Sequence, residues 1–315
     1  MKALKLIGAL SLLLLGHAAS AQELRIAAWN IENLHHEAGV ELRENIGTRR
    51  DESDFPILVS YANQFGADAR PADLIALQEI GTMAAAERLF PPEDYLILMS
   101  ERYHNDQASG IDGRIYTAIA IRKESGIELL EQRDIDALSI LHDGRPTRSA
   151  ATALLEFNGI RFWFSSLHLK SSCSTVRNAH TSTNDDCVTF WAQGATLTDW
   201  IAERRTEGTP FILAGDFNRR FRQFQNEGPF WERINGGDLN EPWLSQHPEF
   251  VTRKCPTRKG SSTQPIDWIL LDASVAHWFV EGSFWERRFR QADIDAAGRG
   301  DLSDHCPISI DLLIE

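Results

Sequence analysis

The sequence predicts an α/β (α+β) protein in which two packed β-sheets carry helices on their outer faces. Short, continuously apolar runs, typical of strands buried on both faces, recur along the chain. Asn158-Gly159 lies between two such runs and is a strong β-hairpin signal. A few amphipathic helical segments separate the strands, and no repeat, low-complexity tract or linker interrupts them. Residues 22–315 are therefore expected to form one domain.

Residues 1–21 have the pattern of a secretory signal peptide. Lys2 and Lys5 precede the short apolar stretch 6–15, and Ala19-Ser20-Ala21 forms a cleavage site, so Gln22 is the expected mature N-terminus. The stretch is too short for a membrane-spanning helix. We therefore expect a periplasmic or secreted protein without stable membrane insertion. Removing residues 1–21 from 315 leaves 294.

The charge balance limits the classes of partner. The formal net charge is −13, and it becomes −15 when Lys2 and Lys5 are removed. Such acidity argues against tight, salt-driven clamping of nucleic acid. It remains compatible with a nuclease whose cleft is locally basic, and with a site that gathers metal-binding carboxylates.

The four cysteines of an exported chain are expected to pair. Cys173 and Cys187 flank a Ser/Thr/Asn-rich loop that a disulfide would close, which leaves Cys255 with Cys306. We favour this arrangement, although three connectivities are compatible with the sequence. No C-x-x-C motif is present, which argues against a structural zinc site.

In the first half of the chain, the strands end in polar residues. Leu24, Ile26 and Ala28 alternate and lead into Trp29-Asn30-Ile31-Glu32-Asn33. A helix is expected over residues 54–65, with Pro56 in its first turn and Gly66 after it. The next strand, 73–79, ends at Glu79, and a short helix follows over 82–89. Strands are expected at 95–99, which precedes Ser100-Glu101, and at 115–121, joined by a polar loop.

The second half repeats this pattern. The hairpin 152–168 ends at His168, with Arg148 before it and Lys170 after it. A helix over 189–205 leads to the strand 211–218, in which Gly215 allows a turn or a close approach before Asp216 and Asn218. Arg219, Arg220 and Arg222 follow directly. Residues 129–143 and 223–262 are not assigned. A strand over 265–271 carries Asp267 near its start, and the last strand, 308–313, follows Ser303-Asp304-His305-Cys306-Pro307.

The polar residues at the strand ends suit metal-assisted hydrolysis. They are Asn30, Glu32, Glu79, Glu101, His168, Asp216, Asn218, Asp267, Asp304 and His305. Carboxylates are the ligands that hard divalent cations prefer, and histidines beside carboxylates transfer protons. Arg148, Lys170 and Arg219 are candidate phosphate ligands. The chain has no Gly-rich P-loop and no G-x-S-x-G motif. Phosphate esters are the natural substrates for this chemistry. Taken one at a time, these polar residues are also explained without a function, as parts of Asx turns or of solvated loops.

Six motifs resemble the endonuclease/exonuclease/phosphatase superfamily, whose fold is that of pancreatic deoxyribonuclease, and specifically a secreted bacterial member. They are Trp29-Asn30-Ile31-Glu32, Leu77-Gln78-Glu79, Ser166-Leu167-His168-Leu169, Gly215-Asp216-Phe217-Asn218, Ile266-Asp267-Trp268-Ile269 and Ser303-Asp304-His305-Cys306-Pro307. They occur in the family order and span nearly the whole mature chain. The resemblance implies a four-layer sandwich with two mixed sheets and a site at one end.

The resemblance also implies a role for each residue. Glu79 would hold Mg²⁺ or Mn²⁺, with Asp304 and Glu32 near it. His305, oriented by Asp267, would act as a base or as a stabiliser of the phosphoryl group. Asp216 and Asn218 would position or activate water, and Asn30 and His168 would contact phosphate oxygens. Glu101 matches a glutamate that orients the histidine at position 168. The pattern does not decide which group takes the proton.

The expected function is a monomeric, secreted, metal-dependent nuclease or phosphodiesterase, with DNA as the first candidate substrate. Pancreatic-type enzymes carry an arginine where this chain has Gly81, which makes phosphoester hydrolysis the firmer expectation. A sphingomyelinase-like enzyme is the first alternative and would need an exposed apolar hairpin, for which Pro229-Phe230-Trp231 and Trp243 are candidates. A sugar or inositol phosphatase and an inactive binding scaffold are the others. The choice between endo and exo action stays open.

Overall fold

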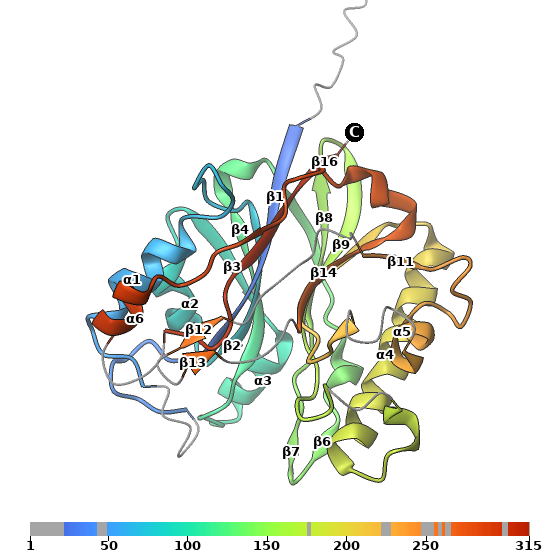
Figure 1. Ribbon diagram of the computed structural model, residues 1–315, viewed down its shortest axis with the longest axis horizontal. Helices are drawn as coiled ribbons and strands as arrows, with labels where there is room; N and C mark the ends of the chain where they lie inside the picture. The colour runs from blue at the N-terminus through green and yellow to red at the C-terminus, as the bar shows by residue number, and fades with distance from the viewer. Residues whose placement is uncertain are drawn as a thin grey trace, which may run out of the picture.

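The computed structural model describes residues 22–42, 49–174, 178–221, 228–246, 255–257, 260–261, 266–297 and 302–314. Two six-stranded mixed sheets pack face to face, and helices cover their outer sides (Figure 1). This is the four-layer α/β sandwich that the sequence predicted. The predicted signal peptide and Arg222 lie outside the described residues.

The first sheet is built around the parallel pair β1 and β2. Its strands, in spatial order, are β15 (Trp285–Glu286), β16 (Ile308–Ile314), β1 (Gln22–Leu34), β2 (Leu74–Ile80), β4 (Tyr116–Arg122) and β3 (Tyr95–Met99). β16 runs antiparallel to β1, and β4 runs antiparallel to β2. The carboxyl ends of β1 and β2 therefore lie beside the amino end of β16.

The second sheet repeats this arrangement around β9 and β10. Its order is β11 (Leu244–Ser245), β14 (Asp267–Asp272), β10 (Phe211–Asp216), β9 (Ile160–His168), β8 (Ala151–Phe157) and β5 (Glu128–Gln132). β10 is parallel to β9 and antiparallel to β14, so Asp216 and Asp267 are paired residues. Two small hairpins complete the strands: β6 (Leu141–His142) with β7 (Arg145–Pro146), and β12 (Pro256–Thr257) with β13 (Gly260–Ser261).

The helices form the outer layers. The first sheet is covered by α1 (Asp54–Ala62), α2 (Met83–Leu89) and α6 (Gln291–Ala296), and the second by α4 (Asp185–Glu207) and α5 (Pro229–Ile234) (Figure 1). Helix α3 (Glu101–Ala108) follows β3. Short 3₁₀ helices occur at η1 (Lys123–Ser125), η2 (Asp136–Leu138), η3 (Ala179–Thr181) and η5 (Ala273–Trp278).

Strand alternation divides the apolar side chains between two cores. In β1, Leu24 and Ile26 belong to the core between the sheets, whereas Ala27, Trp29 and Ile31 belong to the core under the helices of the first sheet. Side chains of a strand point alternately to its two faces, so a strand between two layers is apolar on both. This explains why the central strands appear in the sequence as continuous apolar runs.

Two regions differ from the sequence-based expectation. The polar stretch after β3 is helical, and α3 was not predicted because it buries a single side chain, that of Asp106, and has no apolar stripe. The unassigned region 223–262 contains α5, β11, β12 and β13 within its described parts. These elements are too short to produce a periodic signal.

Two disulfides are present, Cys173–Cys187 and Cys255–Cys306, with Cα–Cα distances of 5.1 and 5.3 Å. The favoured pairing is therefore confirmed. The first joins the segment after β9 to the first turn of α4, and the second joins the segment before β12 to the segment before β16. Among the described helices, none has the length and apolar content needed to cross a membrane.

Candidate active site

Asn30 connects the two sheets at the centre of the site. Its Nδ2 donates to Glu79 Oε1 at 3.2 Å, at the end of β2, and to Asp216 Oδ2 at 3.1 Å, at the end of β10. His168 Nε2 lies 3.6 Å from the same oxygen of Glu79 and 3.6 Å from the same oxygen of Asp216. Residues from four strands in two sheets therefore meet at one point, as the sequence predicted from the strand ends.

Irregular backbone at the strand ends aims these side chains. β1 loses its pairing register between Asn30 and Leu34, and β2 loses its register between Leu77 and Ile80. Four of the eight non-glycine residues with positive φ in the described chain lie here: Glu32, Asn33, Glu79 and Asn218. A left-handed backbone costs a side-chain-bearing residue about 1–3 kcal/mol, and such strain typically gathers at functional sites. Because the backbone is left-handed at Glu32 and Glu79, their side chains do not follow the alternation of a regular strand.

Gly215 allows the second sheet to approach the first. Its φ is +131°, and a Cβ there would lie 2.3 Å from the carbonyl oxygen of Leu167 and 2.7 Å from Gln78 Nε2. Gln78 itself donates from Nε2 to Ser166 Oγ at 3.0 Å, across the interface between the sheets. The close approach that the sequence indicated for this glycine is therefore confirmed.

We expect Gly215→Ala to destabilise the protein by about 2–4 kcal/mol, because the added methyl group pushes apart β9, β10 and Gln78. Urea unfolding followed by circular dichroism measures this change. Gly159→Ala is the matched control: φ is also positive, at +79°, but the Cβ would meet nothing within 4 Å, and about 1 kcal/mol is expected. Equal stability of the two variants would contradict this role for Gly215.

His305 and Asp267 form a buried pair. His305 Nδ1 lies 2.7 Å from Asp267 Oδ2, and His305 is only 6% exposed. Burial by itself would lower the pKa of His305, but the charges of Asp267, Asp304 and Asp216 outweigh it and raise the pKa well above the usual value. The imidazolium is thus the favoured form at neutral pH. The predicted orientation of His305 by Asp267 is present in the structure.

Asp216 is the most enclosed carboxylate of the centre. Burial raises its pKa to about 7; the charge of His305 opposes this shift, and those of Asp267 and Glu79 add to it. Asn218 donates to Asp216 from its backbone N (2.7 Å) and from Nδ2 (3.1 Å), which fixes the carboxylate. A carboxylate that titrates near neutral pH is suited to accept or hold a proton of water.

Glu101 is not brought to the centre. It is the first residue of α3, its side chain is exposed, and its backbone amide donates to Asp134 Oδ2 at 2.6 Å. His168, in contrast, is 4% exposed. The predicted orientation of His168 by Glu101 is therefore wrong, because helix α3 begins at once and turns the side chain to solvent.

Three carboxylates gather beside the centre. Burial, then the charge of Asp304, raises the pKa of Glu32 to about 8, and Glu79 adds to this shift. The backbone N of Asp304 donates to Glu32 Oε2 at 2.9 Å, and the backbone N of Asn33 donates to Glu79 Oε2 at 3.0 Å. Mutual repulsion between carboxylates in a low-dielectric site is relieved when a divalent cation binds. The donor set therefore fits Mg²⁺ or Mn²⁺.

Within the described residues, one trio has possible ligand atoms that all lie within 4.8 Å of one another: Asp216, Asp267 and His305. The predicted ligands Glu32, Glu79 and Asp304 are not grouped as tightly. His305 and Asp267 already satisfy each other, and Mg²⁺ prefers oxygen ligands while keeping several of its waters. The three carboxylates therefore remain the predicted metal-ligand set.

The predicted basic residues have different surroundings. Arg148 Nη2 donates to the carbonyl oxygen of Leu169 at 2.8 Å, and Lys170 Nζ lies 2.6 Å from Asp186 Oδ1. Both are near the centre, since Asn218 Nδ2 donates to that same carbonyl at 3.0 Å. Arg219, however, is 1% exposed, and its Nη1 donates to the carbonyl of Cys173. Its contact with phosphate stays a prediction; in the structure this guanidinium nitrogen contacts the protein backbone.

The sequence did not reveal the supporting residues. Arg50 is 2% exposed and donates from Nη2 to the carbonyls of Ile31 (2.8 Å) and Leu302 (2.7 Å), on either side of the carboxylate group. Ser303 Oγ donates to the carbonyl of Asn30 at 2.8 Å and accepts from the backbone N of His305 at 3.0 Å. Ser303 is the first residue of the motif Ser303-Asp304-His305-Cys306-Pro307, but no role was predicted for it, whereas Arg50 lies outside all six motifs.

Comparisons with known proteins agree with this geometry. The model of the Endonuclease/Exonuclease/phosphatase family matches residues 27–305. No curated protein matches the sequence. An endonuclease/exonuclease/phosphatase family protein from Bacteroides thetaiotaomicron is similar in structure, with a TM-score of 0.57, 16% identity, and coverage of 94% of this chain and 99% of that one.

Two further solved structures are similar. TDP2 from D. rerio, complexed with a single-strand DNA product, has a TM-score of 0.55 and 17% identity over 92% of this chain and 98% of that one. A mannosyl-6-phosphatase from Bacteroides thetaiotaomicron has a TM-score of 0.56 and 17% identity over 92% and 100%. At these identities the likeness establishes the fold.

Proposed function

Because this chain belongs to the endonuclease/exonuclease/phosphatase family, we propose that it is a secreted, divalent-metal-dependent phosphodiester hydrolase that acts on nucleic acid. One observation carries the proposal: Asn30, Glu79, Asp216 and the His305–Asp267 pair converge at one end of the two sheets. The sequence pattern of residues 1–21 supports secretion.

The residues divide the reaction between them. Asp216, held by Asn218, orients the attacking water and accepts its proton. The imidazolium of His305 and the amide of Asn30 stabilise charge that develops on the phosphoryl oxygens. His168 contacts the same oxygens. A cation held by Glu79, with Glu32 and Asp304, supplies Lewis-acid stabilisation of the phosphate when it is bound.

The similarity to D. rerio TDP2, complexed with a DNA product, supports a nucleic-acid substrate. The similarity to a mannosyl-6-phosphatase supports a phosphatase as the alternative. The head-group hydrolase is disfavoured: Phe230 is fully buried and Trp231 is 6% exposed, and the other candidate, Trp243, is half-buried and packs against the core.

The test is hydrolysis by residues 22–315 with Mg²⁺, with Mn²⁺ and with EDTA, using His305→Ala as control. Plasmid DNA, RNA, bis-p-nitrophenyl phosphate and sphingomyelin are assayed side by side. Metal-dependent nicking of DNA that is lost in the variant supports a nuclease. Activity on the small diester or the lipid alone moves the assignment to another phosphodiesterase, and inactivity on all four contradicts the proposal.

We expect Mg²⁺ or Mn²⁺ to raise the Tm of the protein by roughly 2–6 °C, because binding relieves repulsion among the carboxylates. Differential scanning calorimetry with and without EDTA measures this shift. Glu79→Gln removes the central ligand and should abolish it, whereas Glu101→Gln, exposed on α3, should keep it. If the Glu79→Gln variant kept the full metal-induced rise in Tm, the metal would bind at another site.

A further inference from the structure

A cavity of about 270 Å³ lies beside the catalytic centre. Its walls come from helix α3, the segment before β4, the β6–β7 hairpin and the residues after β9. Leu169 separates it from the centre: its carbonyl accepts from Arg148 and from Asn218, and its backbone N donates to the carbonyl of Asp216 at 3.0 Å. Two residues that line the cavity are therefore linked to the centre through Leu169: Arg148 by a hydrogen bond, and Lys170 by the chain itself.

The cavity is basic in an acidic protein. Five of its lining residues are arginine or lysine and three are aspartate, although the chain as a whole carries a net charge of −13. One carboxylate, Asp106, is shared by Arg102 at 3.0 Å and Arg114 at 3.4 Å. A single carboxylate cannot neutralise two guanidinium groups. The surplus positive charge in a concave site favours an anion.

Arg145 adds to this surplus. It lies on β7 with an exposed side chain, and it forms no ion pair with any residue in the described part of the chain. Arg148, three residues later, is held at the boundary to the centre by its bond to Leu169. These guanidinium groups suit a phosphate, whose oxygens accept two parallel hydrogen bonds from one arginine.

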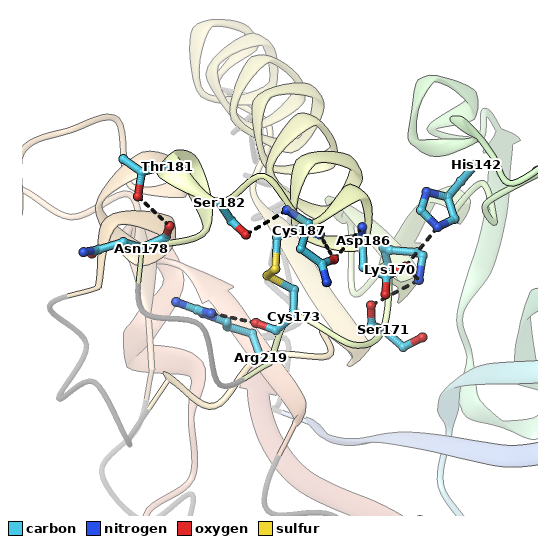
Figure 2. Close-up of a disulfide and its surroundings, with 11 residues drawn as sticks. His142, Lys170, Ser171, Cys173, Asn178, Thr181, Ser182, Asp186, Cys187 and Arg219 are labelled. Atoms are coloured by element: carbon cyan, nitrogen blue, oxygen red, sulfur yellow. Dashed lines mark hydrogen bonds and ion pairs between the residues drawn. A yellow bond between two sulfur atoms is a disulfide. The ribbon is translucent and has the colours of Figure 1, made fainter.

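The wall opposite α3 is held in place by covalent and ionic links. Figure 2 shows Lys170, Asp186 and His142 directed toward one another beside the Cys173–Cys187 disulfide. Asp186 Oδ1 lies 2.6 Å from Lys170 Nζ and 2.9 Å from His142 Nε2, so it joins the hairpin, the segment after β9 and α4. Because these side chains are already held in place, binding a ligand does not incur the entropic cost of ordering them, which favours affinity.

We propose that this cavity is a second anion subsite. It takes a phosphate group other than the one that is hydrolysed, so the preferred substrate carries at least two phosphates. The inference rests on the proposed phosphodiester hydrolysis for its kinetics, but the binding of a bisphosphate is independent of turnover. The second phosphate is either the terminal phosphate of a short substrate or the next phosphate of a polynucleotide.

The binding test uses calorimetric titration of the inactive His305→Ala protein with Mg²⁺ present. Thymidine 3′,5′-bisphosphate should bind about tenfold more tightly than thymidine 3′-monophosphate. Arg114→Gln combined with Arg145→Gln should reduce this advantage to less than about twofold. Arg161→Gln, an exposed arginine paired with Glu156 on the second sheet, should keep it. Equal affinity for both nucleotides, or an advantage that persists in the double variant, overturns the proposal.

The single variant Arg145→Gln provides a test that does not depend on the folding of the double variant. The side chain of Arg145 is exposed, and its removal breaks no ion pair within the described residues. Thermal melts of each variant accompany the titrations. A loss of the advantage in this single variant, at unchanged Tm, supports the subsite.

The kinetic test compares dithymidylate with and without a 5′-phosphate, and then a single-stranded oligonucleotide. A kcat/KM ratio of about ten in favour of the 5′-phosphorylated dinucleotide, reduced by Arg145→Gln, assigns the subsite to a terminal phosphate. A gain that appears only with the oligonucleotide assigns it to a polynucleotide backbone. No gain with either overturns the proposal. If nothing is hydrolysed while bisphosphate binding still depends on Arg145, the proposed function fails and the subsite remains.

Discussion

Replacing His305 with alanine is expected to reduce kcat on bis-p-nitrophenyl phosphate by at least about 10³-fold, because the variant loses the imidazolium that stabilises developing charge. The ring contacts Asp267 at 2.7 Å and lies 3.9 Å from Asp216 and 3.6 Å from Asp304, so its charge faces three carboxylates of the site. The fold should remain, because His305 lies at the edge of the sandwich. Steady-state kinetics and circular dichroism measure the two effects.

His277→Ala is the matched control, since His277 is exposed on η5 and distant in the fold from the strand ends that form the site. It should retain full activity. Retention of more than about a tenth of the wild-type kcat by His305→Ala would contradict the assignment.

The pH profile shows how His305 acts. Because neighbouring carboxylates raise its pKa well above the usual histidine value, His305 keeps its proton to higher pH than a free imidazole does. If the imidazolium is the active form, the rate falls on the alkaline side. Asp267→Asn removes the partner that raises the pKa most, so this fall should move to lower pH. A rate that instead rises as His305 loses its proton would make the neutral ring the base.

Asp216→Asn is expected to abolish turnover, with a loss of at least about 10³-fold, while the metal-free protein becomes more stable by about 1–2 kcal/mol, or roughly 2–4 °C in Tm. The amide keeps the shape of the side chain and removes a carboxylate that burial keeps from ionising. Its nitrogen cannot accept the hydrogen bonds that one carboxylate oxygen accepts from Asn30 or Asn218, which limits the gain in stability. Kinetics and calorimetry on the same preparation measure both effects.

The sign of the stability change follows from the pKa. The pKa of Asp216 is about 7 in the folded protein, above the ordinary aspartate value of 3.8, so ionisation costs more in the folded state. This cost grows as the pH rises from about 4 through 7, and the variant should therefore gain most at neutral pH and nothing in acid. Asp199→Asn, exposed on α4, should change neither property. An active or destabilised Asp216→Asn would refute this account.

Much of the site was predictable because its information is local. Asp216, Glu79 and His168 end buried strands, and a carboxylate or imidazole in such a place is costly unless it has a function. The order of six short motifs identified the family and the four layers. The family resemblance also implied the His305–Asp267 pair, and the loop between Cys173 and Cys187 favoured the disulfide pairing that is present. In each case the deciding residues are adjacent to the element that positions them.

Other features depend on contacts between distant segments. Nothing in the sequence near Arg219 indicates that the Cys173 carbonyl covers it, and nothing near Glu101 indicates that a polar helix begins there. Arg50 supports the site only because the segments that follow Asn30 and precede Asp304 meet at its side chain, where it donates to the carbonyls of Ile31 and Leu302.

The sequence by itself determined the long central strands and the polar residues at their ends, and its motifs indicated the four layers, since burial on two faces requires apolar runs and leaves polar residues where strands stop. The tertiary structure decided which of those residues meet. Parallel pairing of β1 with β2 and of β9 with β10 brings carboxyl ends together, and antiparallel β14 and β16 add Asp267 and His305 from their amino ends. The basic cavity exists for the same reason: its cations come from segments that only the packing of the two sheets places around one space.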